Sequence, residues 1–201
     1  MMKRLWQLSL IGVLGLLVIK CGESEEAPAD TDPVDEVDVQ QAFLNQLISL
    51  CDVEITGEAT YPEENGDHPL VDTELRVHVE TCEDDEVRLD LYRDYDTWHG
   101  TWVLTMREEG LHLYHDHAGD DGESDGPTGY GGYADPDRGS NFKQYFPADE
   151  TTAAMDSAYE TNEWMMEIDL ENEQFIYYLE RHSEPRFRAV MDMSDIMADA
   201  R

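Results

Sequence analysis

The chain has 201 residues, of which 47 are Asp or Glu and 13 are Lys or Arg, so its formal net charge is −34. This balance argues against nucleic acid as a partner and against adhesion of the folded surface to anionic lipid, because both need a basic patch that the sequence lacks. Hydrophobic residues make up 40% of the chain and aromatic residues 9%, which excludes a wholly disordered acidic polypeptide. The length suits one folded domain.

Residues 1–20 are predicted to be a signal peptide. Lys3 and Arg4 come first, and residues 8–19 then form an apolar run that only Ser and Gly interrupt. A membrane-spanning helix would need about 20 apolar residues, so the shorter run is typical of the central region of a signal peptide.

The end of this segment carries a second pattern. Val18 and Cys21 resemble the lipobox of bacterial lipoproteins, although Lys20 stands where that family has Gly, Ala or Ser. The resemblance implies that Cys21 is lipidated and holds the protein on a bacterial membrane, outside the cytoplasm, in the periplasm or on the cell surface. Plain secretion and an uncleaved anchor are the alternatives.

Residues 21–38 are predicted to be the lipidated Cys and an acidic, flexible tether. From position 22 to 38 the stretch contains Pro28 and Pro33, many carboxylates and no basic residue. Such a composition repels itself and buries too little apolar surface to fold.

The charge also predicts an environment. Loss of Lys3, Arg4 and Lys20 with the signal peptide would remove three positive charges and change the net charge from −34 to about −37. Self-repulsion of this size destabilises a compact state unless salt screens it, and the Debye length falls to about 3 Å at 1 M salt. We therefore expect a domain adapted to high salt; a cation-binding surface in ordinary medium is the alternative.

Cys51 and Cys82 form an even pair once Cys21 is assigned to lipid, and an oxidising compartment favours a disulfide between them. Two strands are predicted on either side of a turn at 61–67. Pairing Ile55 with Val77 places Cys51 next to Cys82 at the open end of this hairpin. Closing a loop of this size is expected to contribute about 3–4 kcal/mol.

Residues 39–193 are predicted to form a single β-rich domain. Asp38 and Gln41 suggest a capping box, and apolar residues at helical spacing predict one amphipathic helix over 39–50. The remainder alternates apolar and polar residues with period two. Strands are expected near 53–60, 72–81, 87–92, 102–106, 111–117, 142–146, 164–170, 175–179 and 187–191.

About eight such strands in sequential hairpins predict a mainly β fold, either an antiparallel up-and-down barrel or a two-sheet sandwich. Asp149 is expected to cap a short helix. Residues 194–201 are expected to be a frayed C-terminus.

One segment has the composition of a site. His115 and His117 end an apolar row that begins at Leu111, and the two imidazoles lie on one face of a strand, a geometry that can chelate zinc. Asp120, Asp121 or Asp125 could supply a third ligand. The alternative is a pair of polar histidines at the rim of the fold.

The loop over 118–140 carries these carboxylates and half of the 14 glycines of the chain. Its 121–126 portion has the spacing of the first half of a calcium loop, but Gly132 stands where the bidentate Glu belongs. Calcium is therefore a second candidate cofactor. Together with Tyr130 and the stretch 146–149, this region loosely resembles parts of small secreted bacterial proteins, which implies no particular activity.

These patterns predict a non-catalytic lipoprotein of the cell envelope that binds a small ligand or a cation. The first alternative is a metal-dependent enzyme built on His115, His117 and the loop carboxylates. The second is a structural module that binds another envelope protein.

The salt adaptation has a direct test. We expect the free energy of unfolding to rise steeply between dilute buffer and about 1 M KCl, because screening relieves the repulsion among the carboxylates. Denaturant unfolding at several salt concentrations measures it. Full stability in dilute buffer would contradict this expectation.

Overall fold

The computed structural model describes residues 36–62, 70–118, 124 and 126–199. The predicted signal peptide, Cys21 and the tether up to residue 35 lie outside the described residues. The helices are α1 (Glu36–Ile48), α2 (Glu150–Met155) and α3 (Ser194–Asp199). The strands are β1 (Glu54–Tyr61), β2 (Glu74–Cys82), β3 (Glu86–Arg93), β4 (Thr97–Arg107), β5 (Gly110–Asp116), β6 (Tyr130–Tyr133), β7 (Lys143–Pro147), β8 (Asn162–Asp169), β9 (Gln174–Arg181) and β10 (Glu184–Asp192). Within the described ranges, every helix is too short or too polar to cross a membrane.

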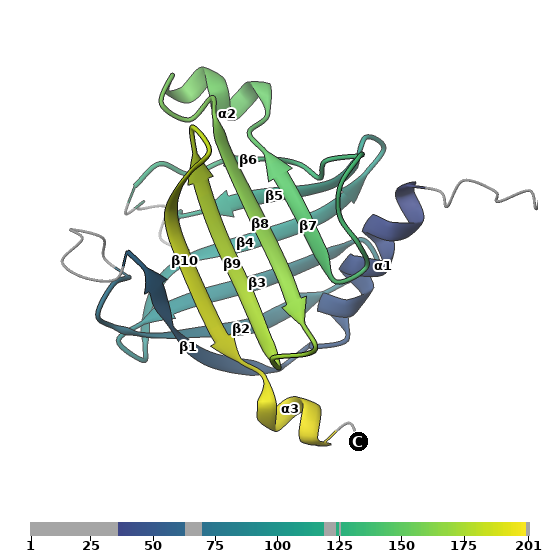
Figure 1. The fold of residues 1–201 in the computed structure, drawn as a ribbon, viewed down its shortest axis with the longest axis vertical. Helices are drawn as coiled ribbons and strands as arrows, with labels where there is room; N and C mark the ends of the chain where they lie inside the picture. Colours follow the sequence, from purple (N-terminus) through teal and green to yellow (C-terminus); the bar gives the residue numbers. More distant parts are fainter. Residues whose placement is uncertain (1–35, 63–69, 119–123, 125, 200–201) are drawn as a thin grey trace, which may run out of the picture. The chain divides into compact units, whose positions relative to one another are not determined.

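The strands form one antiparallel sheet in the order β6-β5-β4-β3-β2-β1-β10-β9-β8-β7. Neighbours in sequence pair with each other except β6 and β7, which lie at the two ends of this order. Strand β1 also pairs with β10 over the register Thr56↔Asp192 to Tyr61↔Arg188. The sheet curls so that β7–β10 pass in front of the strands from the first half of the domain (Figure 1). The fold is therefore mainly β, as predicted, and of the two predicted architectures it is the up-and-down barrel, with ten strands instead of about eight.

The barrel is nearly closed between β6 and β7, where two backbone hydrogen bonds connect the two segments. The N–H of Asp149 donates to the carbonyl of Gly131 (3.1 Å), and the N–H of Asp135 donates to the carbonyl of Tyr145 (2.7 Å). Both bonds fit the same antiparallel register. Pro147 lies between them in this register and cannot donate a further bond, because proline has no N–H. Strands β6 and β7 are thus the two edge strands of the sheet, and these bonds bring them together.

Strand β6 lies within the segment 118–140, which was predicted to be a loop. The glycines of β6 explain why the strand was not predicted and why it fits into the sheet. Gly in a strand lowers its propensity, so the segment has the composition of a loop. A Cβ at Gly131 would lie 1.8 Å from the Leu113 carbonyl oxygen, and one at Gly132 would lie 1.9 Å from the Pro147 carbonyl oxygen. Only a strand without side chains at these positions fits between β5 and β7.

Helix α1 fills one end of the barrel. Phe43, Leu44 and Leu47 are fully buried in the core, and each contributes about 1.5–3 kcal/mol through burial. The side chain of Gln40 accepts a hydrogen bond from the N–H of Leu111 at the β4–β5 end (2.7 Å). The helix begins at Glu36, so Asp38 lies inside it and is not the N-cap that the sequence suggested.

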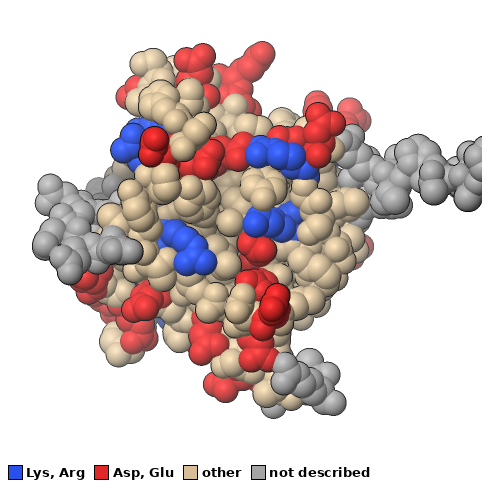
Figure 2. Space-filling model, viewed as in Figure 1, with Lys and Arg blue, Asp and Glu red and all other residues tan. Residues whose placement is uncertain are grey.

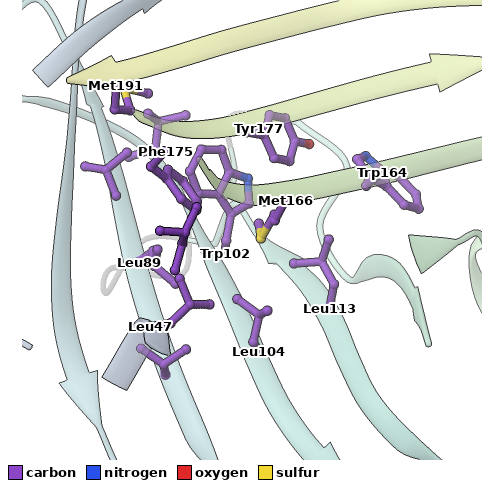
Figure 3. Packing of buried hydrophobic residues seen from close by; sticks show 14 of the residues in the cluster. Leu47, Leu89, Trp102, Leu104, Leu113, Trp164, Met166, Phe175, Tyr177 and Met191 are labelled. Atoms are coloured by element: carbon purple, nitrogen blue, oxygen red, sulfur yellow. The ribbon is translucent and has the colours of Figure 1, made fainter. Parts of the chain in front are cut away.

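Packing of the core follows the predicted alternation. Along β8, every second residue from Asn162 is buried. Figure 3 shows Trp102, Leu104 and Leu113 from β4 and β5 facing Trp164 and Met166 from β8 across the interior. The two halves of the meander therefore bury their apolar faces against each other.

The predicted disulfide joins Cys51 to Cys82, with Cα atoms 6.0 Å apart. The predicted register Ile55↔Val77 is also confirmed. The bridge ties the chain after α1 to the end of β2, and so holds the helix at its end of the barrel.

The ends of the domain confirm one prediction and correct another. Asp149 caps α2 by accepting a hydrogen bond from the N–H of Thr152, as predicted. Residues 194–199 form α3 instead of a frayed end. The helix is ordered because the apolar side chains of Ile196 and Met197 pack against the core beside the buried Met193.

Candidate functional site

The end of the barrel opposite α1 is hollow. A cavity of about 190 Å³ opens there, between the ends of β3–β5 and β8–β10 and the connections that follow β5 and β7. Its described lining is mostly aromatic and aliphatic, with a few polar groups. The lining residues are Leu70, Leu91, His99, Gly100, Thr101, Trp102, His115, His117, Pro127, Tyr130, Tyr159, Asn162, Trp164, Tyr177, Leu179, Arg181 and Phe187.

Stacked rings form the walls of this cavity. Trp102 stacks on Tyr177 with ring centroids 4.4 Å apart, and His115 stacks on Tyr130 at 4.5 Å. Trp164 lies 5.0 Å from His115 and 5.8 Å from Tyr130. In Figure 3 the hydroxyl of Tyr177 points toward the indole of Trp164. Such rings offer flat apolar faces with polar edges, which suit a planar ligand.

His115 is held as a neutral imidazole. Its Nδ1 lies 3.1 Å from the carbonyl oxygen of Tyr130, which can only accept, so Nδ1 carries the proton. Nε2 then accepts a hydrogen bond from the hydroxyl of Tyr177 (2.8 Å). Burial lowers the pKa of His115 to about 3, although the hydrogen bond to the Tyr130 carbonyl acts to raise it. The side chain is therefore uncharged at any physiological pH.

His117 repeats this arrangement one step nearer the cavity mouth. Its Nδ1 donates to the carbonyl of His99 (2.8 Å), and its Nε2 accepts from the hydroxyl of Tyr130 (2.9 Å). The two histidines thus share a pattern in which a backbone carbonyl sets the tautomer and a tyrosine occupies the remaining lone pair. Burial raises the pKa of Tyr130 and, further, that of Tyr177, so both phenols keep their protons at neutral pH.

The polar side of the cavity is built from β8 and β9. Arg181 donates from Nε to the side-chain oxygen of Asn162 (2.7 Å), and its guanidinium lies 5.3 Å from the ring centre of Tyr159. Asn162 is itself buried. None of the described residues that line the cavity is Asp or Glu, although the outer surface carries many carboxylates around the edges of the β7–β10 face (Figure 2).

The connection that carries α2 and Tyr159 is fastened to the barrel. The hydroxyl of buried Thr152 donates to the Gly131 carbonyl (2.8 Å) and accepts from the Gly131 N–H (2.7 Å). Nε2 of His112 pairs with Asp149 (3.1 Å). Burial lowers the pKa of His112 despite this carboxylate, so the ring is neutral and donates to it. These bonds hold one rim of the cavity at the β6–β7 junction.

Of the residues predicted to bind a metal, the structure describes the two histidines and not the three aspartates. His115 and His117 do meet in one cavity, as their spacing indicated, but each has its free nitrogen engaged by a tyrosine hydroxyl. Asp120, Asp121 and Asp125 lie outside the described residues. Within the described part of the chain, no group of three His, Cys, Asp or Glu side chains is placed to hold a metal ion. Zinc and calcium binding stay predictions.

The sequence patterns did not identify Arg181 as a site residue. The sequence did contain an indication of its position. Arg181 follows Tyr177 and Leu179 at a spacing of two, and alternate residues of a strand lie on the same face, here the interior one. The partnership of each histidine with a tyrosine had no such signal, because Tyr177 is 62 positions from His115.

Comparison with protein-family models, with curated proteins and with solved structures gave no match. The proposed function therefore rests on the geometry and chemistry of the cavity.

Burial of His115 predicts a pH dependence of stability. The imidazole has a pKa near 6.5 when unfolded and about 3 when folded. Below pH 6.5 the unfolded chain binds a proton that the folded chain rejects, so the free energy of unfolding falls by about 1.4 kcal/mol per pH unit down to about pH 3. Denaturant unfolding at pH 4–7 should show this contribution in the wild type and not in His115→Gln. His182→Asn, at an exposed position, serves as the control; an unchanged slope in His115→Gln would contradict the assignment.

Proposed function

We propose that this domain binds a small, planar, largely apolar molecule in the barrel cavity and releases it unchanged. The observation that carries the proposal is the aromatic cavity at the end opposite α1. Its volume of about 190 Å³ exceeds the 150 Å³ or so in which an engineered apolar cavity binds benzene. A ligand of about one substituted ring therefore fits.

The size of the barrel explains why a cavity exists. Side chains just fill the interior of a barrel of about eight strands, and wider barrels leave room. Here ten strands surround the interior, and α1 fills only one end with Phe43, Leu44 and Leu47. At the other end the large rings of Trp102, Trp164 and Tyr177 line the space without filling it.

The chemistry of the lining supports binding without catalysis. A general base needs an available lone pair and a pKa near the working pH. His115 has a pKa of about 3 and both nitrogens engaged, while Tyr130 and Tyr177 hold their protons more tightly than free tyrosine. These groups are suited to form the fixed walls of a binding cavity.

We also propose that the domain is held outside the cytoplasmic membrane through a lipidated Cys21, in a salt-rich medium. The lipobox-like residues, the acidic stretch after them and the net charge support this location. The Cys51–Cys82 disulfide fits an oxidising compartment. A tethered binding domain would collect its ligand at the envelope.

Binding in the cavity can be tested with neutral aromatic probes. We expect toluene, phenol or indole at about ten times its Kd to stabilise the wild type by about 1.4 kcal/mol, which raises Tm by about 2–4 °C for a domain of this size. Leu179→Trp narrows the cavity and should lose the shift. Leu170→Trp, at a half-exposed position in the β8–β9 turn, should keep it.

Thermal unfolding with each probe and ligand-observed NMR measure these effects. If a probe stabilises the wild type and both tryptophan variants respond alike, the cavity is not the binding site.

The anchor is tested by the intact mass of protein extracted from membranes. We expect a chain that begins at Cys21 and carries a diacylglyceryl group. The Cys21→Ser variant cannot be lipidated, so we expect it either to be absent from the membrane fraction or to retain its first 20 residues. A wild-type chain that starts at Met1 without lipid would refute the anchor.

A further inference from the structure

We propose that the ligand is an anion, namely a small aromatic carboxylate whose ring lies between the aromatic walls and whose carboxylate binds Arg181. This inference rests on the proposed function, because it assigns the chemical class of molecule that the cavity holds. Three features of the cavity carry it.

The first feature is the sign of the charge. In a chain with 47 acidic and 13 basic residues, the described lining of the cavity contains one guanidinium and no carboxylate. The described lining thus has the opposite sign of charge to the chain as a whole. A cavity of this sign selects against cations and favours an anion.

The second feature is the state of Arg181. Several other arginines pair with carboxylates: Arg76 with Glu54, and Arg138 with Asp135 and Glu163. Arg181 makes no ion pair with any described residue, and the one described hydrogen bond of its side chain runs from Nε to the amide oxygen of Asn162. That bond leaves the two terminal nitrogens without a described acceptor.

The third feature is the fixed position of this guanidinium. Asn162 is buried, and Tyr159 lies against the guanidinium at 5.3 Å. Two restraints therefore hold a planar fork at the cavity wall before a ligand arrives. A fork held in this way binds a carboxylate through two parallel hydrogen bonds at little cost in side-chain entropy. In the partly enclosed cavity such a pair is screened less than at the surface.

The ring of the ligand follows from the remaining lining. Trp164 and Tyr130 lie nearly parallel, at an angle of 28°, and Trp102 lies at 23° to Tyr177. The site thus offers flat faces for a ring and a fork for a carboxylate.

The experiment compares benzoate with benzamide, which has nearly the same shape and no charge. At pH 7 we expect the wild type to bind benzoate at least about tenfold more tightly than benzamide, because a hydrogen bond to a charged group is stronger than one to a neutral group. Arg181→Gln should abolish this preference and change benzamide affinity less than about twofold. Arg186→Gln, at an exposed position outside the cavity, is the matched control and should keep the preference.

Dissociation constants come from tryptophan fluorescence and ligand-observed NMR, with circular dichroism to verify that each variant is folded. Equal binding of both probes, or a preference that survives Arg181→Gln, would overturn the carboxylate assignment and leave the cavity proposal standing. Binding of toluene, phenol or indole without benzoate would do the same. Failure of benzoate, benzamide and the neutral probes together would overturn the proposed function itself.

Discussion

The pairing of the first strand with the last is the constraint on which the rest of the domain depends. Each of the other strand pairs joins neighbours in sequence, and without β1–β10 they would form two separate meanders, β1–β6 and β7–β10, each with two exposed edges. The β1–β10 pair joins these meanders into one sheet, and the two hydrogen bonds at the β6–β7 junction nearly close that sheet into a barrel. Closure leaves an interior that ten strands make too wide for their own side chains to fill.

The two ends of this interior are built in different ways. At one end α1 supplies Phe43, Leu44 and Leu47 from outside the sheet, and the Cys51–Cys82 bridge holds the chain that follows. At the other end none of the described helices is inserted, and the hydroxyls of Tyr177 and Tyr130 bind His115 and His117 instead. Polar groups placed inside a barrel need such partners, because an unpaired buried donor or acceptor costs about 1–3 kcal/mol. The hydrogen-bonded histidines therefore keep the cavity walls fixed while the space between them stays open.

Local patterns predicted the parts of the structure that local physics decides. Alternation of apolar and polar residues located most strands, and the register Ile55↔Val77 located the disulfide, because a strand shifted by one residue would turn its apolar side chains outward. The same reasoning missed β6, where Gly131 and Gly132 are required by the close approach of strands on either side. It also missed α3, whose Ile196 and Met197 are ordered by contact with the core rather than by their own propensity.

The sequence by itself determined the class of fold, the disulfide and the face on which His115 and His117 lie, since period-two alternation and strand register are properties of adjacent residues. Only the tertiary structure decided what surrounds those histidines. Tyr177 reaches His115 from a strand 62 positions away, and Arg181 meets Asn162 and Tyr159 only because β8 and β9 are neighbours in the ring. The negative charge of the chain describes its surface, whereas the closed barrel places a single arginine and no carboxylate among the described residues that line its cavity.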